Sequence, residues 1–202
     1  ASSGNQPIYR ENGANGMPYV KFDGSDDFLS YAYDSSNSPF LNPDVLTIFT
    51  VTTDITGMNG GILSSRNSND GYYIKYDNSN TRFNLGHHNT TVSTANGSRA
   101  ALHYPNMLTI RTSDTGDGDT LWDTVQISVD SELSLASTGS KTYTKNTSGA
   151  FDVGRESSSY LNGYIHEILI YNVALTDTDV EKVEGYLSRK YGISLHNNHT
   201  YK

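Results

Sequence analysis

Short runs of alternating apolar and polar residues recur along this 202-residue chain, separated by clusters of Asn, Asp, Gly and Ser. Alternation with a period of two is typical of strands that bury one face, and the clusters are typical of turns. The runs cover residues 19–22, 28–31, 46–53, 61–64, 72–76, 82–86, 107–111, 124–129, 151–154 and 163–171. Many short strands joined by turns predict an all-β, two-sheet antiparallel sandwich.

The run 163–171 is apolar on both faces of the strand it predicts. Alternation places Tyr164, Ile168 and Ile170 on one face. It places Ile165 and Leu169 on the other face, together with Tyr171. We expect one face to pack into the sandwich and the other to be covered by a further element.

The only helix that the sequence predicts, over residues 177–190, would supply that cover. Thr176 is a suitable N-cap, acidic residues occupy the first turn, basic residues occupy the last turn, and Gly192 can end the helix. One helical stripe is apolar and consists of Val180, Val183 and Leu187. We therefore expect a single C-terminal α-helix packed on the outside of the sandwich.

The charge balance restricts the partners of the chain. Asp and Glu outnumber Lys and Arg by 22 to 14, and the net charge of −8 repels phosphate backbones and anionic membranes. No run approaches the roughly 20 apolar residues that span a bilayer. We expect neither nucleic-acid binding nor membrane insertion. The chain has no Cys and does not begin with Met, and we expect it to be a piece of a longer protein or a processed product.

Two segments carry a family resemblance. The opening GMPYVKFDGSDDFL (residues 16–29) and the closing segments LNGYIHEILIYN (161–172) and VEGYLSRKYGI (183–193) resemble laminin G-like domains of the concanavalin A-like lectin/glucanase superfamily, of the type in bacterial and phage surface proteins. The resemblance implies a jelly-roll sandwich with one concave face, located extracellularly, on a cell surface or on a virion surface. It also implies a domain over residues 1–195, and we expect residues 196–202 to be a frayed C-terminal tail.

The same resemblance bears on catalysis. Retaining glycosidases of this superfamily carry two Glu residues with an Asp between them on one strand, and this chain has no such Glu-x-Asp-x-x-Glu pattern. Glu167 is the single Glu within a confidently predicted strand, and we interpret it as structural. No Gly-x-Ser-x-Gly elbow is present either. We expect no catalytic residues, with an accessory module of a polysaccharide-degrading enzyme as the remaining link to catalysis.

Aromatic residues near the predicted strand ends are candidate ligand-binding residues. A ring beside Asn or Asp would suit a pyranose, although each ring could instead pack on its own sheet. His87 and His88 could contact a sugar or a metal, or could be solvated loop residues. The candidate set is Tyr72, Tyr73, His87, His88, Trp122, Tyr143 and Tyr160.

Clustered carboxylates raise the question of Ca²⁺, which takes six to eight oxygen ligands. Asp114, Asp117 and Asp119 lie within six residues and alternate with glycines. They predict either a Ca²⁺ loop or an acidic hairpin turn. Asp23, Asp26 and Asp27 form a second cluster, for which a role in the turn is sufficient.

These features predict a carbohydrate-binding or adhesion module whose partner is a glycan or cell-surface polysaccharide. The alternative is a structural or assembly protein, such as a phage head or tail decoration or a surface-layer component. Its partners would be other copies of the chain or other structural proteins.

Overall fold

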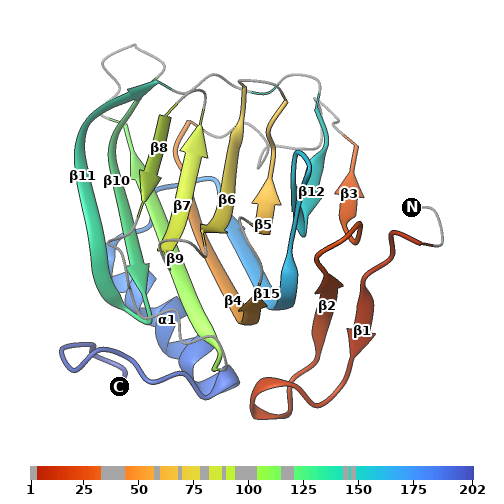
Figure 1. Ribbon diagram of the computed structural model, residues 1–202. Coiled ribbons are helices and arrows are strands. Elements are labelled where there is room, and N and C mark those ends of the chain that lie inside the picture. Colours follow the sequence, from red (N-terminus) through yellow and green to blue (C-terminus); the bar gives the residue numbers. More distant parts are fainter. Residues whose placement is uncertain are drawn as a thin grey trace.

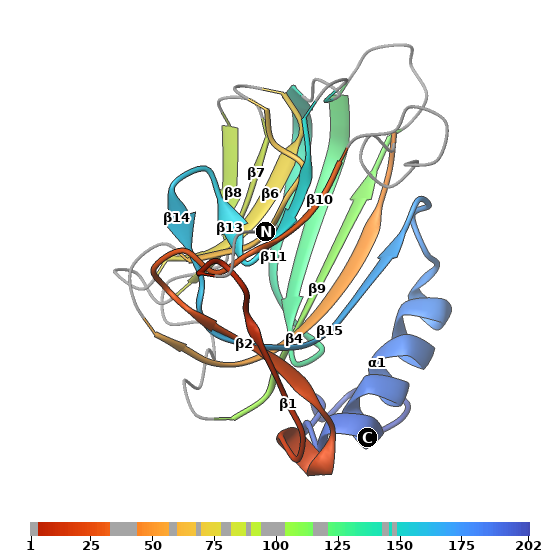
Figure 2. The ribbon, with the colours of Figure 1, turned by 90° about the vertical axis from the view of Figure 1, so that its right-hand side faces the viewer.

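The computed structural model describes residues 4–32, 44–56, 60–67, 70–77, 82–87, 90–93, 104–114, 121–142, 146 and 149–202. Only the backbone is described at residues 87, 90, 92, 93, 121 and 134–142. Two antiparallel sheets face each other, and a helix lies behind one of them (Figures 1 and 2). The all-β sandwich with one C-terminal helix is confirmed.

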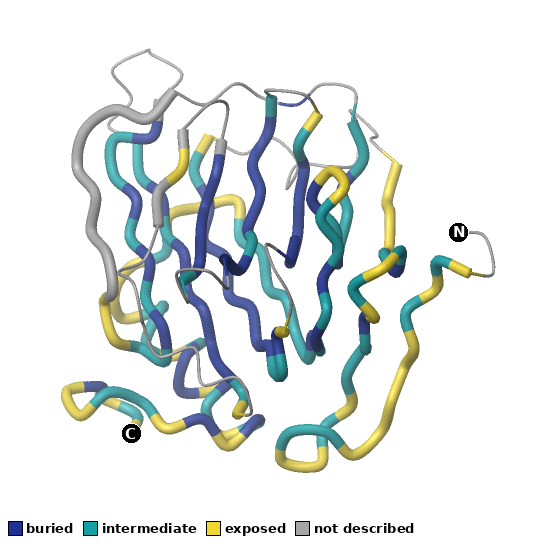
Figure 3. Tube along the Cα trace, viewed as in Figure 1, coloured by how far each residue is buried: buried dark blue, intermediate teal, exposed yellow. Residues whose placement is uncertain are grey.

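The larger sheet, called sheet A, has seven strands. In spatial order they are β1 (Ile8–Arg10), β2 (Tyr19–Asp23), β15 (Asn162–Tyr171), β4 (Thr47–Thr56), β9 (Asn106–Ser113), β10 (Leu121–Val129) and β11 (Glu132–Thr142). The N-terminal strand β1 lies at one edge and is exposed, whereas β4 and β9 in the middle are buried (Figure 3). A short 3₁₀ turn, η1 (Ala14–Gly16), joins β1 to β2.

The smaller sheet, called sheet B, has six strands. In spatial order they are β3 (Leu29–Tyr31), β12 (Phe151–Val153), β5 (Gly60–Ser64), β6 (Tyr72–Asp77), β7 (Arg82–His87) and β8 (Thr90–Ser93). A small hairpin follows β12 and consists of β13 (Arg155–Glu156) and β14 (Ser159–Tyr160). Its backbone lies against Gly61 of β5, where a Cβ would overlap the backbone of Glu156.

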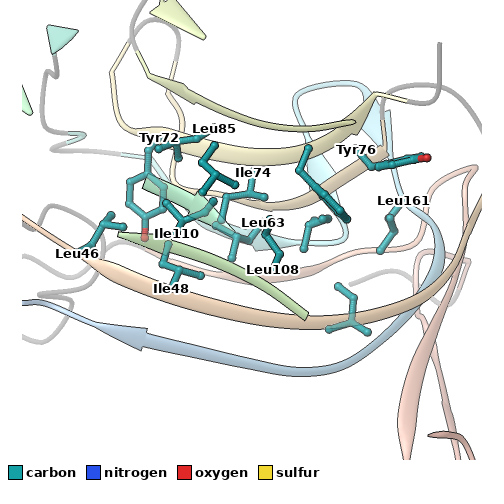
Figure 4. Close-up of a cluster of buried hydrophobic side chains, with 14 of the residues drawn as sticks. Leu46, Ile48, Leu63, Tyr72, Ile74, Tyr76, Leu85, Leu108, Ile110 and Leu161 are labelled. Atoms are coloured by element: carbon teal, nitrogen blue, oxygen red, sulfur yellow. The ribbon is translucent and has the colours of Figure 1, made fainter. Parts of the chain in front are cut away.

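The main core fills the space between the two sheets (Figure 4). Sheet B contributes Tyr72, Ile74 and Leu85, which point toward Ile48 and Ile110 of sheet A. All five side chains are buried. Each large apolar side chain removed from water stabilises the fold by roughly 1.5–3 kcal/mol.

The strand over residues 163–171 differs from the prediction in one respect. The pairing of β15 with β4 contains a register shift between Ile165 and Glu167. Because a bulge adds one residue to the strand, Ile165 faces the core on the same side as Ile168 and Ile170. The predictions that Ile165 shares a face with Leu169 and that Tyr164 shares a face with Ile168 are therefore wrong.

The helix α1 (Asp177–Tyr191) begins and ends as the sequence indicates. The Thr176 side chain accepts a hydrogen bond from the Asp179 amide at 3.2 Å, and Gly192 ends the helix with a φ of 70°. Leu187 packs against Phe49 of β4 in a second apolar cluster on the outer face of sheet A. Figure 2 shows α1 on the side of sheet A that faces away from sheet B.

The C-terminal segment 196–202 is packed against α1, so the expectation of a frayed tail is wrong. His199 is 7% exposed, and its Nε2 lies 3.1 Å from Oε2 of Glu184. Tyr201 covers Gly185, where a Cβ would lie 2.7 Å from Cβ of Tyr201. A glycine in the middle of the helix costs helix propensity, but here it admits the tail.

Candidate functional site

The face of sheet B that points away from the core is the candidate functional site, and we call it the outer face of sheet B. Along β6, Tyr72, Ile74 and Tyr76 enter the core, so the intervening residues point outward. Along β7, Phe83 and Leu85 enter the core in the same way. The residues presented outward by these two strands are Tyr73, Lys75, Asp77, Arg82, Asn84 and Gly86.

Cross-strand pairing places the outward residues in rows. One row crosses all six strands and consists of Ser30, Asp152, Ser64, Tyr73, Gly86 and Thr91. In the neighbouring row, Lys75 lies directly opposite Asn84. Side chains that are directly opposite each other have Cβ atoms about 4.5–5.5 Å apart. Most of these residues are polar, in contrast to the outer face of sheet A, which is apolar beneath α1.

Tyr73 lies at the centre of this face and is 6% exposed. Its ring occupies the space beside Gly86, where a Cβ would overlap the ring. Its hydroxyl lies 3.2 Å from Oγ1 of Thr91. The Arg66 guanidinium and the Lys75 ammonium lie 5.3 and 5.2 Å from the ring centroid. Tyr73 therefore holds two cations on this face and is not an open stacking platform.

Most cations on the outer face of sheet B have a carboxylate partner. Arg66 pairs with Glu156 at 2.9 Å, which ties the chain after β5 to the β13–β14 hairpin. The other two pairs are Arg82–Asp77 at 3.1 Å and Arg155–Asp152 at 2.6 Å. Among the residues that the structure describes, Lys75 has no carboxylate within ion-pair distance.

Two buried acceptors on this face have no hydrogen-bond donor. Within the described part of the chain, nothing donates to Oδ1 of Asn84 or to Oδ1 of Asp152. The Asn84 side chain is 4% exposed, and an unsatisfied buried acceptor costs about 1–3 kcal/mol. Both oxygens are buried, so a donor from outside the chain would reach them only after the side chains around them move.

Tyr160, one of the predicted ligand-binding residues, lies at the border of this face and is half-buried. Its ring centroid is 6.4 Å from that of Phe28. The Arg155 guanidinium lies 3.6 Å from the Phe28 ring centroid, and its pKa is raised by Asp152 and Tyr160 against the effect of burial. Tyr160 thus helps to anchor the arginine that pairs with Asp152.

Two predicted ligand-binding residues lie in the core instead. Tyr72 and Trp122 are 0% and 1% exposed, with ring centroids 6.4 Å apart. The indole Nε1 of Trp122 donates to the Asp44 carbonyl at 2.9 Å. The prediction that these two rings form a binding platform is wrong, because inward-facing positions of sandwich strands require large apolar side chains.

The other predicted residues are not brought together by the described structure. His87 ends β7 opposite Tyr72, and only its backbone is described. His88, Tyr143, Asp117 and Asp119 lie outside the described residues. Asp114 follows β9 and is half-buried.

Sequence reasoning missed Arg66, Lys75 and Asn84. The alternation in residues 72–77 and 82–86 already contained a signal for two of them. It places Lys75 and Asn84 on the face opposite the apolar side chains. The sequence contains no comparable signal for Arg66, which follows β5 and depends on tertiary packing to reach Tyr73.

The acidic cluster Asp23, Asp26 and Asp27 forms a turn, as expected. The Ser25 amide donates to Oδ1 of Asp23 at 2.8 Å, and the Asp23 amide donates to Oδ2 of Asp27 at 3.0 Å. Carboxylate oxygens of the three residues lie within 4.8 Å of one another. Burial and the neighbouring Asp23 raise the pKa of Asp27.

Glu167 has a structural partner, in agreement with its interpretation from sequence. Its Oε2 accepts a hydrogen bond from Nζ of Lys190 at 3.1 Å. This ion pair joins β15 to α1, on the far side of sheet A from the outer face of sheet B. The Tyr186 hydroxyl and the Glu167 carboxylate, which both accept hydrogen bonds from Nζ of Lys190, raise the pKa of Lys190.

A hollow of about 360 Å³ lies between sheet A, α1 and the C-terminal segment. Most of its charged side chains are already paired with one another. Arg111 pairs with Asp177 at 2.6 Å and with the Gln126 amide oxygen at 3.0 Å. Glu184 accepts a hydrogen bond from the Thr109 hydroxyl at 2.7 Å. The outer face of sheet B has an unpaired cation and two acceptors without donors among the described residues, and it is therefore the stronger candidate for a functional site.

The fold and this polar face define a protein of the lectin-like sandwich class. A family model for the concanavalin A-like lectin/glucanases superfamily matches residues 47–181, which is more than half of the chain. The chain belongs to this superfamily. A comparison with curated proteins gives no significant match. No helix in the described residues has the length and apolar character needed to cross a bilayer.

Solved structures share the fold at low identity. The chain is similar to the CBM40 of the Ruminococcus gnavus IT-sialidase bound to α2,3-sialyllactose, with 12% identity, a TM-score of 0.62 and coverage of 88% of this chain and 98% of that one. A heptameric SAP-like pentraxin from Limulus polyphemus shows 13% identity, a TM-score of 0.61 and coverage of 82% and 81%. Botulinum neurotoxin type C, whose cell entry depends on two ganglioside molecules, shows 13% identity, a TM-score of 0.61 and coverage of 92% and 48%.

Proposed function

We propose that this chain is a non-catalytic carbohydrate-binding or adhesion module that binds a glycan on the outer face of sheet B. The observation that carries the proposal is the pair of donor-less acceptors on this face, Oδ1 of Asn84 and Oδ1 of Asp152. Sugar hydroxyls are donors that would satisfy both once the side chains that bury these oxygens move aside. A glycan-binding role would place the module outside the cell, on a cell surface or a virion surface.

The spacing of the two acceptors favours an oligosaccharide. Asn84 lies on β7 and Asp152 on β12, with β5 and β6 between them. Three strand spacings of about 4.8 Å, together with an offset of two residues along the strand, separate them by roughly 16 Å. One sugar residue cannot reach both acceptors, whereas a short oligosaccharide lying across the strands can.

Similar proteins support this reading. The Ruminococcus gnavus CBM40 was solved with a sialylated sugar, and the neurotoxin interacts with gangliosides. Both share the sandwich with this chain at low identity. They support a glycan as the general class of partner, and they do not identify which glycan this chain binds.

A broad glycan array, run with and without Ca²⁺, tests the proposal. We expect saturable binding to at least one oligosaccharide. Asn84→Leu should reduce that binding at least tenfold, because it removes the acceptor, and it should raise the melting temperature by removing an unsatisfied buried oxygen. A role of Asn84 in stability alone would produce the opposite pattern, with a lower melting temperature and unchanged binding.

Thr50→Val is the matched control. Oγ1 of Thr50 is also buried and has no partner in the described structure, but it lies on β4 of sheet A. This variant should gain stability and bind glycans like the unaltered chain. If no glycan on the array binds and the chain instead assembles into ordered oligomers, the structural or assembly role is the better description.

A further inference from the structure

The outer face of sheet B carries a local excess of positive charge on an acidic chain. The chain has a net charge of −8, yet on this face the described residues include four cations and three carboxylates. Arg66, Arg82 and Arg155 are each paired with a carboxylate. Lys75 is the cation that remains without one among the described residues.

Lys75 is placed beside the acceptor that lacks a donor. It lies directly opposite Asn84 on the neighbouring strand, so their Cβ atoms are about 4.5–5.5 Å apart. Its ammonium offers three donors, and among the described residues it lies against the Tyr73 ring, 5.2 Å from the centroid. An unpaired donor group and an unfilled acceptor therefore adjoin each other.

We propose that the glycan bound here contains a negatively charged sugar whose anionic group pairs with Lys75. A hydroxyl of the same sugar residue donates a hydrogen bond to Oδ1 of Asn84 once the side chains that bury this oxygen move aside. Either a carboxylate or a sulfate ester has the required chemistry. This inference rests on the proposed function, and it adds the charge of the ligand and the residue that recognises it.

Tyr73 explains why a charged group is preferred to a stacked neutral ring. The ring is 6% exposed, with Gly86 against it and both cations within 5.3 Å of its centroid. A pyranose cannot lie flat on it. The ring instead fixes the positions of Lys75 and Arg66, and cations prepositioned in this way lose less conformational entropy when they bind an anion.

Matched oligosaccharide pairs test this inference on the full chain. Trigalacturonate and sialyllactose are each compared with their carboxyl-reduced forms, and a sulfated galactan oligosaccharide is compared with its desulfated form. Dissociation constants are measured by titration calorimetry. We expect at least one anionic member to bind tenfold or more tightly than its neutral counterpart.

Variants of Lys75 test whether its charge is responsible for the preference for anionic sugars. Lys75→Gln should remove most of the difference within the matched pair, whereas Lys75→Arg keeps the charge and should retain it. Lys182→Gln is the control, because Lys182 is exposed on α1 and pairs with Asp179 at 2.9 Å. This control should bind all ligands like the unaltered chain. Melting curves confirm that each variant is folded.

The outcomes separate this inference from the proposed function. If neutral and anionic members bind equally, or if Lys75→Gln leaves the preference unchanged, the charged-sugar inference is wrong and the glycan-binding proposal stands. If only neutral glycans bind on the array, the charged-sugar inference is likewise wrong and the glycan-binding proposal stands. If no glycan of any kind binds, both proposals fail.

Discussion

Gly86 leaves a space on the outer face of sheet B that the Tyr73 ring fills. An alanine Cβ at this position would overlap the ring. Gly86→Ala should therefore displace Tyr73, together with the two cations that contact it. We expect a loss of about 1–3 kcal/mol in the free energy of unfolding from overpacking, measured by urea denaturation, and weaker glycan binding.

Gly4→Ala is the control for Gly86→Ala. Gly4 is exposed, and a Cβ there would meet one atom, Oδ2 of Asp26, at 3.9 Å. Gly4→Ala should change the free energy of unfolding by no more than about 0.5 kcal/mol. If Gly86→Ala behaves in the same way, the ring is not fixed by the glycine and Tyr73 is free to adopt another position.

The candidate site was only partly predictable from single residues. Composition drew attention to aromatic residues at strand ends, but neighbouring residues of a strand face opposite ways. Tyr72 and Tyr73 therefore have different environments, one in the core and one on the outer face of sheet B. Alternation could have separated them. The unmet acceptor of Asn84 depends on the strand register, which the sequence does not specify.

At the scale of elements, α1 covers the apolar outer face of sheet A. Leu187 is 0% exposed and packs in a cluster with Phe49, Val51 and Met107. Leu187→Ala should lower the free energy of unfolding by about 2–5 kcal/mol, because it leaves a cavity between the helix and the sheet. Tyr186→Ala, at a position that is 49% exposed on the same helix, should cost much less. Equal losses in denaturation experiments would contradict this packing.

The helix was predictable because its signals are local, whereas the β15 bulge was not. Thr176, the apolar stripe and Gly192 all lie within about 17 residues of one another, so each can be recognised in the chain itself. The bulge between Ile165 and Glu167 depends on how β15 pairs with β4, more than 100 residues earlier in the chain. Strict alternation assigned Ile165 to the wrong face for this reason.

Glu184 connects three elements and makes stability depend on pH. It accepts a hydrogen bond from Thr109 of β9 and contacts His199 of the C-terminal segment. Burial raises its pKa above the ordinary value of 4.5, and these two contacts oppose the shift. Folding thus favours the protonated carboxyl, and its stabilising contribution is complete below pH 4.5 and lost as pH rises through the raised pKa.

Glu184→Gln tests this dependence, because glutamine keeps hydrogen-bonding groups but does not titrate. Relative to the unaltered chain, the variant should become progressively more stable as pH rises above 4.5, as measured by urea denaturation over a pH series. Glu181→Gln on the same helix is the control and should show no such trend. A stability difference that does not change with pH would refute the assignment to Glu184.

For the whole molecule, the two sheets have different roles on their outer faces. Sheet A is covered by α1 and the C-terminal segment, which bury its apolar side chains. Sheet B carries polar and charged side chains on its outer face, with unmet donors and acceptors. The sandwich therefore has one face suited to stability and one suited to recognition. This division was predictable in part, since the sequence indicated that the helix covers residues 163–171.

Calcium is the remaining question for the whole molecule, and melting temperature is the appropriate measurement. We propose that any Ca²⁺ bound by the chain is held by Asp114, Asp117 and Asp119, three carboxylates that lie within six residues and have glycines between them. A ligand that binds only the folded state raises the melting temperature as its free concentration exceeds the Kd. EDTA should reverse that rise, and the double variant Asp117→Asn, Asp119→Asn should abolish it without unfolding the chain. Asp26→Asn, in the turn that contains Asp23, is the control. If this variant abolishes the rise in melting temperature instead, the ion binds at that turn. If Ca²⁺ and EDTA both leave the melting temperature unchanged, residues 114–119 form a solvated turn.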